Sequence, residues 1–174
     1  MWEFQPNKPK NTVEGEVMKL IIKQRIFSLT DSYDIYDENM NKKYTAKADF
    51  FALGYRIRFF DRNDLEIGCI EEKLLRLFAE FDVYIMGSRY GSIKKKLSLF
   101  TPKYDIDYNG WSVTGDIFEW NYEVRTYNGL VIAYIKKEIL NLSDTYVIDI
   151  LNDSDEISVL LLVAAIDAAN CSRN

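Results

Sequence analysis

A repeated tripeptide constrains the fold of this chain more than any other feature of its sequence. An aromatic residue, a polar residue and a β-branched apolar residue follow one another at intervals of 18 to 26 residues. The instances are Tyr33-Asp34-Ile35, Tyr55-Arg56-Ile57, Phe81-Asp82-Val83, Tyr104-Asp105-Ile106, Tyr122-Glu123-Val124 and Tyr146-Val147-Ile148, of which only the last lacks a polar middle residue. This alternation is the period of a half-buried strand. The pattern predicts a chain built from repeated β-strands.

A second apolar run precedes each repeat by a few residues. These runs are Phe27-Ser28-Leu29, Phe51-Ala52-Leu53, Leu75-Arg76-Leu77, Leu97-Ser98-Leu99, Ile117-Phe118 and Leu140-Asn141-Leu142. We interpret each as the end of a strand, so that every unit is a pair of strands. Turn signals such as Asn109-Gly110 and Asn128-Gly129 separate the units. Six such hairpins predict about twelve strands.

The C-terminal segment indicates how these strands are arranged. From Ile157 to Ala169 only Ser158 and Asp167 are polar, and a helix that is apolar on all sides must be buried on all sides. Asp153 with Glu156 resembles a helix cap. A membrane anchor is the alternative, but 13 residues are short for a span of about 20. Since about eight strands already make a barrel that side chains fill, twelve leave room for a central helix. We therefore predict a closed, mostly antiparallel barrel of about twelve strands around the C-terminal helix.

The domain organisation follows from where the periodic pattern begins. Residues 1–17 contain Pro6 and Pro9 and show no periodicity or apolar signal segment, so we expect a mobile extension. Residues 18–174 are expected to form a single barrel domain. With 48% hydrophobic residues, the chain is not disordered by composition.

Composition removes several classes of function. There is no histidine, which excludes histidine-based catalysis, histidine metal sites and histidine pH switches. The cysteines, Cys69 and Cys171, are too few for a disulfide framework or a cysteine zinc site, and suggest a reducing, cytoplasmic environment. The formal net charge of −5 argues against a nucleic-acid partner.

Six segments together resemble the LURP-one-related family over about Lys19 to Asn170. They read IIKQRIFSLTDSYDIYDEN, EEKLLRLFAEFDVYI, IKKKLSLFTPKYDID, WSVTGDIFEWNYEV, IKKEILNLSDTYVIDI and LLLVAAIDA. That family is similar in fold to the tubby C-terminal domain and to phospholipid scramblases. The resemblance implies a twelve-stranded barrel around a hydrophobic C-terminal helix, in agreement with the strand count. It implies little about activity, although tubby domains bind phosphoinositides and scramblases act on lipids.

Five lysines form the only candidate binding site that the sequence suggests. Lys23, Lys47, Lys73, Lys95 and Lys137 recur in the first half of their units. At similar heights on a barrel they would form a basic belt for anionic headgroups or phosphates. An ordinary solvated outer face with edge-protecting lysines is the alternative, and the net negative charge favours it.

The acidic clusters give weaker signals. Asp61 to Glu72 imitates part of a calcium loop but has Glu66 where glycine is required, so a hairpin turn is expected. The segment Asp149–Glu156 is a weak calcium candidate, for which helix capping is the simpler account. Asp105 and Asp107 share one strand face, and solvent exposure explains them better than catalysis. No catalytic residue, resident metal or cofactor is predicted.

These observations favour a non-enzymatic, cytoplasmic interaction or ligand-binding module, monomeric, with an unknown protein or small-molecule partner. The alternative is a peripheral domain that binds anionic phospholipid headgroups, in the manner of tubby or scramblase domains.

Overall fold

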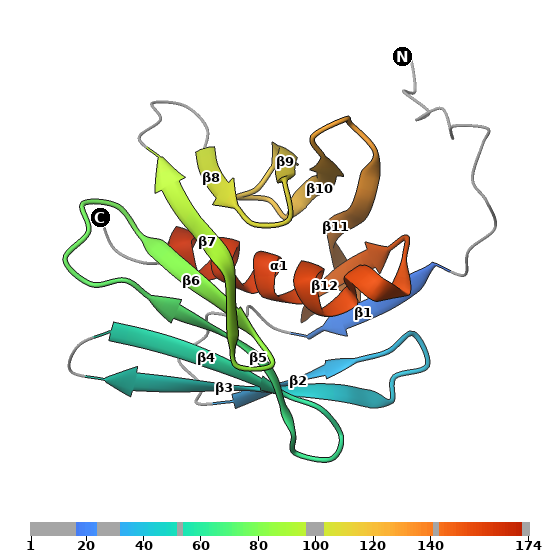
Figure 1. Ribbon diagram of the computed structural model, residues 1–174. Helices are drawn as coiled ribbons and strands as arrows, with labels where there is room; N and C mark the ends of the chain where they lie inside the picture. Colours follow the sequence, from blue (N-terminus) through green and yellow to red (C-terminus); the bar gives the residue numbers. More distant parts are fainter. Residues whose placement is uncertain (1–16, 24–31, 52–53, 97–102, 141–142, 172–174) are drawn as a thin grey trace.

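The computed structural model describes residues 17–23, 32–51, 54–96, 103–140 and 143–171. Twelve strands precede one helix (Figure 1). The strands are β1 (Met18–Ile22), β2 (Ser32–Tyr36), β3 (Lys42–Phe51), β4 (Gly54–Phe60), β5 (Glu66–Glu72), β6 (Glu80–Ile85), β7 (Ser88–Lys96), β8 (Lys103–Asp107), β9 (Trp111–Asp116), β10 (Asn121–Thr126), β11 (Val131–Leu140) and β12 (Ser143–Ile150). A short 3-10 helix, η1 (Asp153–Asp155), leads into α1 (Glu156–Cys171).

The strands form one antiparallel sheet that curls into a nearly closed barrel. Its order runs from β8 back through β7 to β1, and then from β12 back to β9, with β1 paired to β12. This confirms the predicted, mostly antiparallel barrel of about twelve strands. Closure is incomplete at one position, because β8 and β9 are the two outer strands of the order and share no ladder of hydrogen bonds.

The alternation predicted from the sequence determines which side chains face the barrel interior. In β4, Tyr55, Ile57 and Phe59 are buried, whereas Arg56 and Arg58 lie on the outer face and are only partly covered. Trp111 and Trp120 are also buried, and Trp120 packs against Tyr146 with ring centroids 4.0 Å apart. Packing therefore accounts for both tryptophans, as expected from the sequence.

Helix α1 runs through the barrel and supplies the centre of the core (Figure 1). Every residue from Val159 to Ala169 is buried, including the polar Asp167. The prediction of a core helix is confirmed. No helix among the described residues is long and apolar enough to cross a membrane.

The start of this helix differs from the prediction. Asn152, rather than Asp153, is the capping residue, because its side chain accepts a hydrogen bond from the Ser154 backbone N–H at 3.1 Å at the start of η1. The α-helix then begins at Glu156. The chain enters the barrel through a short 3-10 turn that the sequence pattern did not reveal.

The prediction of a mobile extension falls almost entirely outside the described residues, since only Val17 of residues 1–17 belongs to them. Val17 is 46% exposed.

Candidate functional site

The two ends of the barrel carry different kinds of residues. Because the sheet is an antiparallel meander, connections from odd to even strands lie at one end and connections from even to odd strands at the other. We call the first the leucine end, defined by residues 73–79, residues 117–120 and the last turn of α1. We call the second the acidic end, defined by residues 37–41, 61–65 and 152–156.

The connection from β5 to β6 exposes leucine side chains at the leucine end. Leu75 is 103% exposed and Leu77 is 89% exposed, and Leu74 is 44% exposed. The predicted strand end at Leu75-Arg76-Leu77 is therefore wrong, because β5 already stops at Glu72 and Leu75 has a left-handed φ of 57°. We call residues 73–79 the leucine tip. Exposed leucines grouped in one connection are typical of a contact surface.

Ion pairs hold the base of the leucine tip. The Lys73 ammonium lies 2.8 Å from Glu80 Oε1 and 3.1 Å from Asp82 Oδ1, and the backbone N–H of Lys73 donates to the Glu80 carbonyl. Arg76 Nε lies 3.6 Å from the other Glu80 oxygen. The hydrogen bond from Lys73 lowers the pKa of the Glu80 carboxyl and raises that of the Lys73 ammonium. The tip therefore projects from a fixed base.

The five predicted lysines all lie on strands or connections in the half of the barrel toward the leucine end, but not on one face. Lys23 and Lys47 are on the outer face, 4.8 Å above the Tyr36 ring and 4.6 Å above the Phe60 ring. Lys73 is engaged by Glu80 and Asp82, as described above. Their role in binding anions stays a prediction.

The other two lysines follow the inward alternation of their strands at the barrel rim. Lys95 is opposite Tyr104 in the ladder and comes two residues after the buried Ile93. Lys137 comes two residues after the buried Ile135. Three of the five side chains therefore lie on the outer face or at the leucine tip, and two lie at the rim. Their positions in the sequence do not reveal this division.

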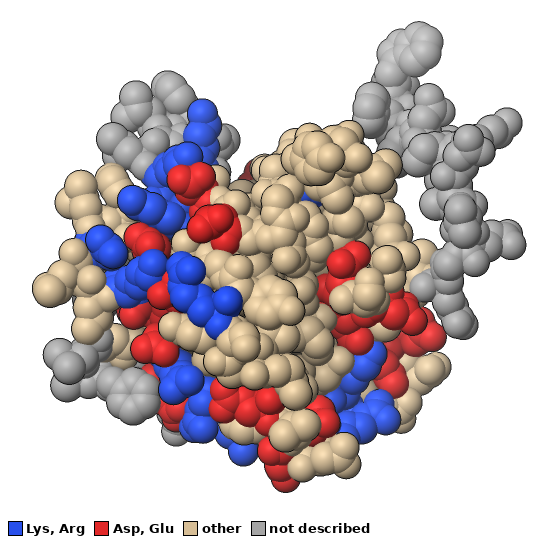
Figure 2. All heavy atoms as spheres, viewed as in Figure 1, with Lys and Arg blue, Asp and Glu red and all other residues tan. Residues whose placement is uncertain are grey.

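Charge is distributed unevenly between the two ends. The acidic end carries Asp37, Glu38, Asp61, Asp64, Asp153, Asp155 and Glu156. Toward the leucine end, the exposed cations include Arg76, Lys94, Lys96 and Lys103. Figure 2 shows Lys and Arg gathered on the left over β6 to β8, among fewer carboxylates, and carboxylates around η1 and the β2–β3 turn on the right. The net charge of −5 does not reveal this separation.

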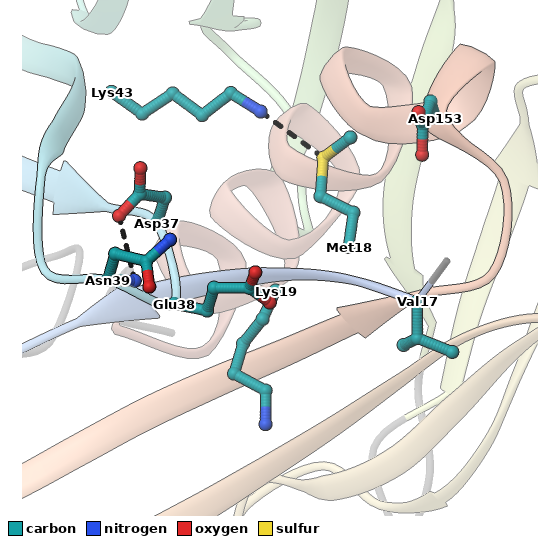
Figure 3. Close-up of a pocket in the computed structure, with 8 residues that line it drawn as sticks. All are labelled: Val17, Met18, Lys19, Asp37, Glu38, Asn39, Lys43 and Asp153. Atoms are coloured by element: carbon teal, nitrogen blue, oxygen red, sulfur yellow. Dashed lines mark hydrogen bonds between the residues drawn. The ribbon is translucent and has the colours of Figure 1, made fainter.

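A pocket of about 230 Å³ opens at the acidic end (Figure 3). Its lining residues are Val17, Met18, Lys19, Asp37, Glu38, Asn39, Lys43 and Asp153. Lys43 Nζ lies 2.6 Å from Glu156 Oε1 and donates to Met18 Sδ at 3.3 Å. Burial of the ring raises the pKa of Tyr44, and the Glu156 carboxylate adds to this shift. Of the charged residues that line the pocket, Lys43 is therefore held by Glu156, which is not part of the lining.

The calcium candidates are engaged in other contacts. Asp149 lies between Lys19 and Lys136, at 3.4 Å and 3.2 Å, and Glu156 is paired with Lys43. Asp61 accepts hydrogen bonds from the backbone N–H groups of its own turn, which lower its pKa. Among the described residues no group of three or more potential metal ligands is close enough to hold an ion.

The remaining candidates, Asp105, Asp107 and Cys69, lie on the outer face of the barrel wall. Asp105 and Asp107 are exposed on the outer face of β8. Cys69 is buried under Arg56, whose Nη2 donates to Sγ at 3.5 Å, and desolvation raises the pKa of the thiol. The side chain of Cys171 lies outside the described residues.

Polar groups inside the barrel gather at the leucine end. Burial is the main cause that raises the pKa values of Tyr33 and Tyr122, and the Asp167 carboxylate adds to both shifts. The Tyr104 hydroxyl donates to Asn170 Oδ1 near the end of α1. Asp167 therefore has tyrosines around it, an arrangement that its place in an apolar run did not suggest.

Comparison with known proteins identifies relatives of the whole domain. A family model described as LURP-one-related matches residues 18–167. The uncharacterised protein YxjI of Bacillus subtilis is 26% identical over 152 residues, which cover 87% of this chain and 93% of that protein. The X-ray structure of an Arabidopsis thaliana protein matches with a TM-score of 0.65 over 88% of this chain and 91% of that one. At 16% identity, the last likeness concerns the fold alone.

Proposed function

The chain belongs to the LURP-one-related family, and on this premise we propose that it is a non-enzymatic binding module whose target is an anionic phospholipid surface. One observation carries the proposal: the leucine tip exposes Leu75 and Leu77 almost completely, with Arg76 between them. Transfer of exposed leucine side chains from water into an apolar phase is favourable, and the cation beside them is attracted to an anionic headgroup layer.

The magnitudes support a shallow, reversible attachment. Burying a leucine side chain contributes about 1.5–3 kcal/mol, and each cation near an anionic membrane surface adds about 1 kcal/mol. Lys94, Lys96 and Lys103 are exposed on the same side of the barrel, while Lys73 is already paired with Glu80 and Asp82. The exposed pair between Lys96 and Asp105 is weak enough to yield to phospholipid headgroups.

The net charge of −5 is compatible with this target because of where the carboxylates lie. The acidic end is opposite the leucine end, so an anionic membrane would repel the first and attract the second. Repulsion at one end and attraction at the other orient the barrel with its leucine tip toward the lipid. The charge separation thereby removes the objection that the overall charge raises against a membrane target.

A non-enzymatic role is supported by the filled interior of the barrel. Helix α1 occupies the space in which a twelve-stranded barrel would otherwise hold a substrate. The paired carboxylates of Asp105 and Asp107 face solvent rather than a cleft. A cytoplasmic location and a monomeric state are part of the same proposal.

Sedimentation with phospholipid vesicles tests the membrane target. We expect binding to phosphatidylcholine vesicles that contain phosphatidylserine, no binding to phosphatidylcholine alone, and weakening as salt screens the charges. The variant Leu75→Asp with Leu77→Asp should lose binding. Leu65→Asp is the matched control, since Leu65 is 55% exposed at the acidic end and should not contribute.

Two results would contradict the membrane target. One is the absence of binding by folded protein at low ionic strength. The other is equal binding by the tip variant and the Leu65 control. The first result would favour an unknown protein or small-molecule partner over a membrane. The second would show that the leucine tip does not attach the protein to the membrane.

A further inference from the structure

The seam between β8 and β9 leaves two strand edges without a partner. The two strands are joined by the turn at Asn109 and Gly110, where the Trp111 backbone N–H donates to the Tyr108 carbonyl at 3.2 Å. Beyond that bond, no backbone hydrogen bond within the described residues joins β8 to β9. Every other strand of the sheet has a partner on both sides.

Each free edge offers backbone groups in a regular row. In an antiparallel sheet the N–H and C=O groups of alternate residues point to the same neighbour. Strand β8 pairs with β7 and β9 pairs with β10, so alternate residues of both strands point into the seam. An unpaired row of this kind is a template for a further strand.

Strand β8 is held firmly by its other neighbour. At Gly91 of β7, a Cβ would lie 1.8 Å from the Asp107 carbonyl oxygen, so only glycine allows the observed approach. The free edge of β8 is therefore presented on a fixed strand.

The two faces of the seam differ in chemistry. On the outer face, Asp105, Asp107 and Asp116 are exposed beside one cation of the same two strands, Lys103, and Asp105 lies 3.3 Å from Lys96 of β7. Within the described residues neither Asp107 nor Asp116 has an ion pair, so the outer face of the seam has more negative than positive charge. On the inner face, Ile106 and Val113 are only half-buried, in contrast to the fully buried interior residues of neighbouring strands such as Ile93. The outer face of the seam is therefore net acidic, and its inner face is an apolar surface that is incompletely covered.

We propose that this seam binds an extended segment of a partner protein in which basic and apolar residues alternate. The segment would pair as a β-strand with the free edge of β8, of β9 or of both. Its basic side chains would lie against Asp105, Asp107 and Asp116, and its apolar side chains would cover Ile106 and Val113. This surface lies along the barrel wall and borders Lys96 and Lys103, to which the proposed membrane attachment also assigns a role. Peptide binding in solution, without vesicles, tests the seam separately from membrane binding by the leucine tip.

Three synthetic peptides test the proposal on the full chain. The first alternates lysine and valine; the second has the same composition with lysines and valines in separate blocks; the third is the first with N-methylated valines, which cannot donate backbone hydrogen bonds. Isothermal calorimetry should show the first binding at least about tenfold more tightly than the other two, a factor equivalent to 1.4 kcal/mol. Hydrogen exchange should slow in residues 103–107 or 111–116 when it binds.

A charge-reversal variant with a matched control separates this seam from unspecific attraction to an acidic protein. Asp105→Lys combined with Asp107→Lys should weaken binding of the first peptide by at least about fivefold, whereas Glu38→Lys combined with Asp153→Lys at the acidic end, with the same change in net charge, should leave it unchanged. All four positions are exposed, so neither double substitution disturbs the core.

The proposal is overturned if the blocked or N-methylated peptide binds as tightly as the first, or if binding leaves the exchange of both strands unchanged. It is also overturned if sedimentation shows that the chain dimerises and these amides are protected without peptide, because a second copy would then fill the seam. Equal weakening by the two charge variants would also overturn the proposal, because it would show that the overall charge of the protein, and not the seam, attracts the peptide.

Discussion

A tight contact between the central helix and the barrel wall gives a quantitative prediction. Gly68 of β5 lies directly against Leu161 of α1: a Cβ added at Gly68 would be 2.7 Å from Leu161 Cδ1 and 2.8 Å from the Tyr84 carbonyl oxygen. Leu161 is fully buried. The glycine therefore makes room for the leucine, and substitutions at the two positions should affect each other.

The expected magnitudes follow from packing. Leu161→Ala removes buried volume from the core and should lower the free energy of unfolding by about 2–5 kcal/mol. Gly68→Ala introduces a methyl group where both neighbours are too close, which should cost about 1–3 kcal/mol. In the Leu161→Ala background only the Tyr84 oxygen remains in the way, so the same glycine substitution should cost about 1 kcal/mol less.

Urea unfolding of the four proteins measures these values, with fluorescence of the buried Trp111 and Trp120 as the signal. A double-mutant cycle then gives the coupling between the two sites. If Gly68→Ala costs the same with and without the leucine, the packing of α1 against β5 described above is wrong.

Three further predictions concern the same fold. Truncation after Asp153, or Leu161→Asp, should give an aggregating protein, because the barrel loses its apolar centre or gains an unpaired charge there; a soluble truncation that unfolds cooperatively would contradict the central-helix fold. Deletion of residues 1–17 should leave the thermal midpoint unchanged, and a midpoint several degrees lower would show that they contribute to the core. The Lys73 hydrogen bond lowers the pKa of Glu80 in the folded state, so it stabilises the protein above the unfolded carboxyl pKa of about 4.3. This stabilisation is lost as the pH falls through the lower folded value. Urea titrations should therefore show that the free energy of unfolding depends less on acid pH in Lys73→Met than in the unchanged protein.

Strand number and the central helix were predictable because they depend on periodicity. The alternation at Tyr55, Ile57 and Phe59 places those side chains inside the barrel, and the run from Val159 to Ala169, apolar except for Asp167, requires burial on all sides. Both signals are local in the sequence. The family resemblance led to the same barrel.

The Phe/Leu-x-Leu motif misled the strand assignment because an apolar run does not distinguish a strand from an exposed connection. Leu75-Arg76-Leu77 has the alternation of a strand, yet Leu75 and Leu77 are in solvent. Four other runs of this type lie wholly or mostly outside the described residues: Phe27-Ser28-Leu29, Phe51-Ala52-Leu53, Leu97-Ser98-Leu99 and Leu140-Asn141-Leu142.

The candidate binding surfaces could not be predicted from composition, because they depend on where charged and apolar side chains lie in three dimensions. The net charge of −5 conceals an acidic end and a more basic leucine end. The recurrence of the five lysines in the first half of their units does not specify that Lys47 points outward while Lys95 follows the inward register at the rim. The open seam depends on which two strands fail to pair, for which the sequence has no local signal.

The orientation of the barrel on a membrane is the most direct test of the proposed function. With both cysteines replaced by alanine, a single cysteine at position 75 or at position 38 carries an environment-sensitive fluorophore. Glu38 serves as the control because it is exposed at the acidic end. On vesicles that contain phosphatidylserine, we predict a blue-shifted, brighter emission from the label at position 75 and no change at position 38. Equal shifts at both positions, or no shift at position 75 in protein that sediments with the vesicles, would contradict attachment through the leucine tip.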